Sequence, residues 1–266
     1  MLSLIRMNLY RCVKTKSLYI MLLITMAIVG FITLMSSMEE AALDQEMIQQ
    51  MEETEESTVG IMIGADPITS GVMMTVEFIG SGLILLLVAI FTALFSNSER
   101  VGGYLKNLNS CAGSKEQIFI AKLAPVILFV TLEIAIVPLT ALIMQLSLDR
   151  MLSKEFLLYL VAEWILHIAY GIFILMIMEI SRSLVTGILC GVFLGMGVGV
   201  LLVNFLESTL LHMDGMLSAH MVVGMVRVLS YENILQVLLP AFGVGIIGSV
   251  AYLLIGTIIF KKRDIY

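Results

Sequence analysis

Charged residues are scarce in this 266-residue chain. They make up 14% of it, whereas an ordinary soluble domain carries about 25%. Hydrophobic residues reach 59%, and the mean hydropathy is +1.03. This composition excludes an ordinary water-soluble fold. Prolines number only four, whereas 21 glycines and 20 methionines suit long helices that pack closely through small residues, as in membrane bundles.

Cysteine and the common enzyme motifs are also sparse or missing. There are three cysteines, and two of them, Cys12 and Cys111, lie in segments that we expect in the cytosol, so we predict no disulfide. The chain has no G-x-x-x-x-G-K-[ST] phosphate loop, and neither G-x-S-x-G nor H-E-x-x-H occurs. Because the phosphate loop is missing, any ATP-driven activity requires a second subunit. We also predict no metal site in this chain.

Long apolar runs predict the fold class. A helix rises about 1.5 Å per residue, so about 20 apolar residues cross a hydrocarbon core of roughly 30 Å. Six runs reach that length, at residues 17–36, 71–95, 118–146, 156–180, 184–205 and 234–260. The third contains Pro125 and Pro138, which predict a kinked or broken helix. We therefore predict an all-α integral membrane protein, a bundle of six transmembrane helices.

Positive charge predicts the orientation, because lysine and arginine favour cytoplasmic loops. One side of the predicted bundle holds most of the 15 basic residues. These are Arg6, Arg11, Lys14, Lys16, Arg100, Lys106, Lys115, Lys122, Arg182, Lys261, Lys262 and Arg263. Only Arg150, Lys154 and Arg227 fall on the other side. Both termini of this multi-pass chain are therefore expected in the cytoplasm.

An acidic segment interrupts the apolar pattern at residues 38–70, which we place outside the cell. It has no lysine or arginine, and its carboxylates are Glu39, Glu40, Asp44, Glu46, Glu52, Glu53, Glu55, Glu56 and Asp66. A solvated external hairpin is one interpretation. The other is a surface that attracts a cationic peptide or a metal ion.

Two further segments look interfacial rather than spanning. Residues 1–16 place Leu2, Ile5, Leu9 and Val13 near one helical face, which predicts a cytoplasmic interfacial helix whose basic residues lie beside anionic lipid headgroups. Residues 206–233 mix apolar and polar residues throughout. This mixture predicts one or two short re-entrant helices at the outer membrane face before the last span.

The cytoplasmic connection at residues 96–117 carries the most informative pattern. An acidic residue precedes Gly-aromatic-aliphatic-Lys-Asn, in the run Ser98-Glu99-Arg100-Val101-Gly102-Gly103-Tyr104-Leu105-Lys106-Asn107, and a polar helix start follows, with Lys122 in the first turn of the span. This pattern resembles the permeases of type-2 ABC exporters, and most closely the Firmicute permeases of bacitracin resistance and lantibiotic immunity. The start of the chain at residues 7–17 and its end at 260–265 also resemble that family.

The resemblance implies a membrane-spanning permease subunit at residues 17–266 of a bacterial ATP-driven exporter. Such a subunit works with a dimer of ATP-binding subunits, which bind ATP and Mg, and with a second permease copy or homologue. Its cargo would be an antimicrobial peptide, a drug or a lipid-like molecule. The permease itself would be no enzyme, hold no cofactor and bind no nucleic acid.

Within the connection, the resemblance implies docking to the ATPase. Glu99 and Arg100 would make charged contacts there, Gly102 and Gly103 would permit a tight turn, and Lys106 would reach a carboxylate or a lipid phosphate. The alternative interpretation is a merely solvated, positively charged cytoplasmic loop.

Ionisable residues inside the spans are the remaining candidates, because a charge at the bilayer centre is costly and often functional. Glu133 lies near the middle of the third span, and Glu163 and His167 are one helical turn apart on the fourth. They would line a translocation route, carry a proton or simply form hydrogen bonds between helices. An intramembrane enzyme at these residues, or a channel or scaffold, is the competing hypothesis. Glu77 and Glu179 lie nearer the span ends, where headgroups are within reach.

Overall fold

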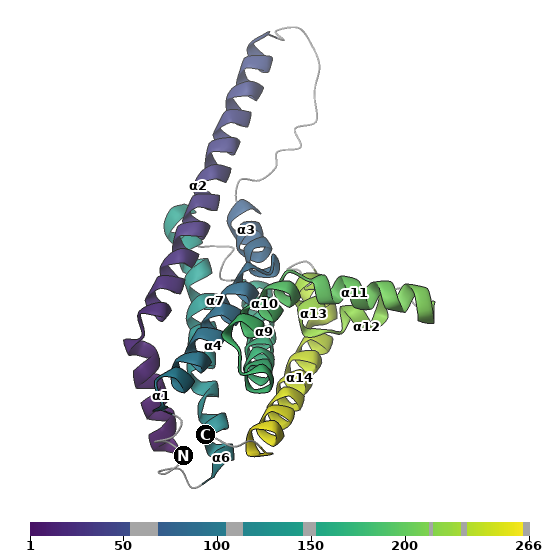
Figure 1. The fold of residues 1–266 in the computed structure, drawn as a ribbon. Coiled ribbons are helices and arrows are strands. Elements are labelled where there is room, and N and C mark those ends of the chain that lie inside the picture. The colour runs from purple at the N-terminus through teal and green to yellow at the C-terminus, as the bar shows by residue number, and fades with distance from the viewer. Residues whose placement is uncertain (54–68, 105–113, 146–152, 213–214, 230–232, 263–266) are drawn as a thin grey trace.

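The computed structural model describes residues 1–53, 69–104, 114–145, 153–212, 215–229 and 233–262 (Figure 1). Over these residues the chain is helical, without a β-strand. The helices are α1 (Leu2–Lys14), α2 (Lys16–Glu53), α3 (Thr69–Gly80), α4 (Leu83–Val101), α6 (Lys115–Ala121), α7 (Leu123–Gln145), α9 (Lys154–Ser181), α10 (Leu184–Gly195), α11 (Val198–Leu206), a π-helical turn η1 (Glu207–Leu211), α12 (Met216–Ala219), α13 (Val222–Val228) and α14 (Ile234–Lys262).

The described part contains five helical segments that are long and apolar enough to cross a membrane. They are Lys16–Met35, Leu83–Val101, Lys115–Ile143, Lys154–Ser181 and Ile234–Lys262. Helices α10 and α11 would together supply a sixth, but they are bent by 63° at the break between them. The all-α fold class is confirmed, and these segments are compatible with a multi-pass membrane protein. The count of six spans stays a prediction.

Helix α9 lies at the centre of the bundle and packs against α4, α7, α10 and α14. Small residues make the close contacts. A Cβ atom added to Gly191 of α10 would come within 2.4 Å of the Cβ of Ala89, and one added to Gly245 of α14 would come within 2.6 Å of Ile165. Without these glycines the helix backbones would have to move apart, as in other membrane bundles.

Two of the predicted spans are interrupted by glycines in the left-handed conformation. The run at 71–95 begins in α3, turns at Gly82 (φ 88°) and continues in α4. The membrane-length helix is therefore Leu83–Val101 rather than the predicted range. The run at 184–205 turns at Gly197 (φ 80°) between α10 and α11. Arg227 of α13 donates a hydrogen bond to the carbonyl oxygen of Gly195, 3.3 Å away, at the end of α10. Its guanidinium therefore complements the negative end of that helix.

The predicted break in the third span lies at Lys122, between α6 and α7. Pro125 follows in the first turn of α7, where its missing N–H removes a bond to the preceding helix. Pro138 lies inside α7 without ending it. The predicted break in this span is therefore present, three residues before Pro125.

The two ends of the bundle differ in charge and shape. At one end lie α1, α6 and the last turn of α14, where Lys261 forms an ion pair with Glu116 at 2.7 Å (Figure 1). We call this the positive end. At the opposite end α2 extends well past the other helices, as far as Glu53 (Figure 1). The first part of the acidic segment is therefore a continuation of α2, and residues 54–68 lie outside the described residues.

The half-polar segment at 206–233 contains η1, α12 and α13. Glu207 in η1 accepts hydrogen bonds from the backbone N–H groups of Leu217 and of Ser218, the latter at 2.9 Å. A carboxylate at the N-terminus of α12 satisfies N–H groups that have no partner within the helix. Glu207 thereby fixes the turn between η1 and α12. Whether this segment enters the membrane stays a prediction.

Candidate functional site

A chain of five charged side chains crosses the positive end of the bundle. Arg11 Nη1 lies 3.1 Å from Glu99 Oε1, and Lys122 Nζ lies 3.1 Å from Glu99 Oε2. The same lysine lies 2.8 Å from Glu179 Oε1, and Arg100 Nη2 lies 3.2 Å from Glu179 Oε2. We call these residues the ion-pair chain. It joins α1, α4, the α6–α7 junction and α9, which are far apart in the sequence.

The residues at the centre of the ion-pair chain are buried. Glu99 and Lys122 are fully buried and Glu179 nearly so, whereas Arg11 keeps 25% of its side-chain surface exposed. Removing such charges from water costs several kcal/mol per ion, and the cost is recovered only where each charge has close partners. A buried network of this kind therefore specifies one arrangement of its helices more than it adds stability.

Local sequence explains why α4 delivers two members of the chain. Glu99 and Arg100 lie in the last turn of α4. Gly102 caps the C-terminus of this helix, and Gly103 follows in the left-handed conformation (φ 65°). Consecutive residues point in different directions on a helix, so the two side chains reach different partners. Arg100 also donates to the carbonyl oxygen of Met178, near the end of α9. A cation there complements both helix C-termini.

Lys122 owes its place to the interruption between α6 and α7. Ser114 begins α6 as its N-cap by accepting a hydrogen bond from the N–H of Gln117, and α6 ends one residue before Lys122. The side chain of Lys122 thereby enters the bundle, where its Nζ also lies 5.0 Å from the ring centroid of Phe260 in α14. This lysine consequently contacts residues from three other helices.

Tyr104 extends the site toward the loop. The Arg11 guanidinium lies over its ring, with Cζ 3.8 Å from the centroid. Burial raises the pKa of the Tyr104 hydroxyl, an effect that the nearby Arg11 charge opposes. The residue following the Gly102–Gly103 turn is therefore held against α1.

The structure changes the expected role of Glu99. Both of its carboxylate oxygens face cations of the same chain, and the side chain is fully buried, so a direct contact with another protein is not available to it in this conformation. Arg100 is largely engaged as well. By contrast, Val101, next in sequence, is 80% exposed. Lys106 lies outside the described residues.

Glu133 is fully buried in α7 and ties that helix to α2. Its Oε2 accepts a hydrogen bond of 2.7 Å from the Thr25 hydroxyl, and its Oε1 has no hydrogen-bond partner among the described residues. Glu133 lies 11 residues beyond Lys122, which corresponds to roughly 16 Å along the helix. It is therefore far from the positive end.

Glu163 and His167 are brought together as their spacing predicted. His167 Nδ1 lies 3.3 Å from Glu163 Oε2 and 2.8 Å from the Glu163 carbonyl oxygen, and both side chains are fully buried. His167 Nε2 has no hydrogen-bond partner in the described part. No hydrogen bond or ion pair among the described residues joins this pair to Glu133, so the three candidates form two separate groups.

Arg11, Lys122 and Glu179 are the functional candidates that sequence reasoning missed. Glu179 was expected to reach lipid headgroups, but it is buried between Lys122 and Arg100. A signal was available, because Lys122 stands within a long apolar run and a lysine there needs an acidic partner. The identity of that partner depends on how distant helices pack, which the local pattern does not contain.

Comparison with protein-family models finds no match, and comparison with curated proteins finds none either. The assignment of function therefore depends on the residues themselves. The ion-pair chain has no free carboxylate or nucleophile for chemistry, since its two acids face three cations of the same chain. What it can do is connect α1, the end of α4 and the α6–α7 junction to the central helix α9.

Proposed function

We propose that this chain is the membrane-spanning permease subunit of an ATP-driven ABC exporter. In this proposal α10 and α11 form a sixth, broken span, and the positive end faces the cytoplasm with both termini. A separate pair of ATP-binding subunits binds ATP and Mg. A second permease copy or homologue completes the transporter, which moves an antimicrobial peptide, a drug or a lipid-like molecule.

The ion-pair chain is the observation that supports this proposal most. A permease subunit without a phosphate loop needs a stiff connection between the surface that binds its ATPase and the helices that line the translocation route. The α4–α6 connection, which resembles the coupling loop of exporter permeases, leaves the bundle directly beside Glu99 and Arg100. Force transmitted to the last turn of α4 would reach α9 through Glu99, Lys122 and Glu179, which form consecutive ion pairs.

The proposed docking contact is Val101 together with the turn that follows it. An apolar side chain that is 80% exposed at the positive end suits the core of a protein interface, because burying it removes apolar surface from water. Gly102 and Gly103 bring the backbone of the turn to the surface. Glu99 and Arg100 act behind this contact as positioning residues.

Co-purification tests the proposal. The tagged full-length chain is isolated from its native membrane in mild detergent, co-purified proteins are identified by mass spectrometry, and vanadate-sensitive ATP hydrolysis is measured. We expect a partner that carries a phosphate-loop motif. Val101→Glu should reduce its recovery about tenfold or more, because a buried, unpaired carboxylate at an interface costs at least about 1.4 kcal/mol.

Met216→Glu is the matched control, since Met216 is also an exposed apolar residue but lies in α12, away from the positive end. It should leave recovery and hydrolysis unchanged. Equal recovery with Val101→Glu would refute the docking contact. The absence of any phosphate-loop protein from the wild-type preparation, with no ATP hydrolysis, would reject the exporter assignment itself.

A further inference from the structure

Helix α1 has three distinct faces. One packs against the bundle through Leu4, Asn8 and Cys12, which are all buried. With about 3.6 residues per turn, the apolar residues predicted to form the interfacial stripe lie on a second face, beside the first. Of these, Leu2 and Val13 are exposed, and Leu2 keeps 83% of its surface. Ile5, in contrast, is partly buried against the core, so this apolar face is uncovered at its two ends, Leu2 and Val13, in the described part of the chain.

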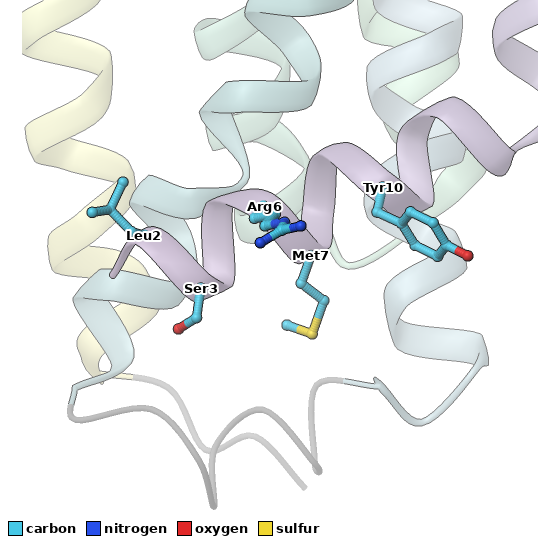
Figure 2. Close-up of a pocket in the computed structure, with 5 residues that line it drawn as sticks. All are labelled: Leu2, Ser3, Arg6, Met7 and Tyr10. Atoms are coloured by element: carbon cyan, nitrogen blue, oxygen red, sulfur yellow. The ribbon is translucent and has the colours of Figure 1, made fainter.

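The third face carries polar and basic side chains and is hollowed into an open groove. Leu2, Ser3, Arg6, Met7 and Tyr10 line this groove (Figure 2). Ser3, Arg6, Met7 and Tyr10 are spaced at i, i+3, i+4 and i+7, so they share one side of the helix. In Figure 2, Ser3 and Met7 point to the same side of α1, whereas Leu2 points to the opposite side, at the rim of the groove.

The groove has unbalanced positive charge. Helix α1 contains no aspartate or glutamate, and Arg6 forms no ion pair or hydrogen bond with any described residue. Lys14 adds a second cation on this face, with Nζ 4.6 Å from the centroid of the Tyr10 ring. Arg11 on the adjoining face is different, because Glu99 already neutralises it.

We propose that this groove binds the headgroup phosphate of an anionic phospholipid. Arg6 would pair with the phosphate, since its planar guanidinium matches phosphate oxygens, and the hydroxyls of Ser3 and Tyr10 would donate to the headgroup. The acyl chains would run along the neighbouring apolar face at Leu2 and Val13. Charge complementarity and this apolar face together favour a lipid over a soluble anion, because only a lipid occupies both.

Photo-crosslinking tests the site. The full-length chain is reconstituted in phosphatidylcholine nanodiscs that contain a minor fraction of photoactivatable phosphatidylglycerol, and the labelled peptides are mapped by mass spectrometry. We expect label on residues 1–14. Arg6→Gln should lower that label about fivefold at low salt, the change expected for one basic residue near an anionic surface. Arg6→Lys should retain most of it, and high salt should reduce it in the wild type.

Lys262→Gln is the matched control, because Lys262 is an exposed basic residue at the same end of the bundle. It should leave the label on residues 1–14 unchanged. Photoactivatable phosphatidylcholine should label them weakly in all variants. Inorganic phosphate should compete no better than chloride at equal ionic strength.

Three outcomes would overturn the proposal. Equal label in the wild type and Arg6→Gln would show that the groove does not select an anionic lipid. Displacement by inorganic phosphate would indicate a site for a free anion instead. Equal label on residues 1–14 from photoactivatable phosphatidylcholine would show that the headgroup charge does not matter. None of these results depends on the exporter assignment, so the two proposals can fail separately.

Discussion

Removing the charge of Lys122 should destabilise the positive end of the bundle. In Lys122→Met, Glu99 and Glu179 remain fully or nearly buried and lose the ammonium group that lies 3.1 Å and 2.8 Å from their oxygens. Methionine has a similar length but cannot pair with either carboxylate. Breaking a buried ion pair by removing one partner typically costs about 3–5 kcal/mol. For a chain of this size, that corresponds to a fall in melting temperature on the order of 10 °C.

Thermal unfolding of the detergent-purified protein, followed by circular dichroism, measures this cost. Lys261→Met is the matched control, because Lys261 forms its ion pair at the surface, with 68% of its side chain exposed. Exposed pairs contribute less than about 1 kcal/mol, so this variant should melt close to the wild type. A double variant that adds Glu99→Gln to Lys122→Met should lose less stability than the sum of the two single variants. If Lys122→Met melts like Lys261→Met, the ion-pair chain does not hold these helices together.

The remaining predictions concern topology and the packing of α1. Reporter fusions after Gln50 and Ser218 should report an extracytoplasmic location and a fusion after Tyr266 a cytoplasmic one; a cytoplasmic signal at Gln50 would invert the orientation. In a variant whose other two cysteines are replaced by serine, Cys12 should react slowly with maleimide at pH 8, because its side chain is fully buried. The reaction should become faster as the pH rises, because burial raises the pKa of the Cys12 thiol to about 11. Glu99→Gln should accelerate this labelling at pH 8 by weakening the contact between α1 and α4, and an unchanged rate would mean that Arg11 does not hold α1 in place.

Hydropathy was sufficient to predict the long helices, because each must be apolar over its whole length to cross a bilayer. It was insufficient for the breaks. Gly82 and Gly197 break helices, whereas other glycines in the apolar runs, such as Gly191, serve only close packing. Nothing in the local sequence distinguishes a glycine that breaks a helix from one that packs. The difference lies in a backbone conformation that is fixed by neighbours such as Arg227.

The candidate site was predictable only in part. The i, i+4 spacing of Glu163 and His167 placed them together on one helix, since that contact is local. The partners of Glu99 come from α1 and the α6–α7 junction, so their identity depends on tertiary packing. Counting basic residues one by one placed Arg11 and Lys122 on the same side of the bundle, but it treated them as markers of orientation rather than as members of one network.

The length of α2 means that a small tilt of this helix near the ion-pair chain would produce a large displacement at its far end. Helix α2 has 38 residues, or about 57 Å of continuous helix, and it begins directly after Thr15, whose extended backbone separates it from α1. A rigid rod of that length that tilts by roughly 5° at its base moves its far tip by about 5 Å. A small adjustment of α1 against Glu99 that tilted α2 would therefore be magnified, like the motion of a lever arm, at the far end of α2.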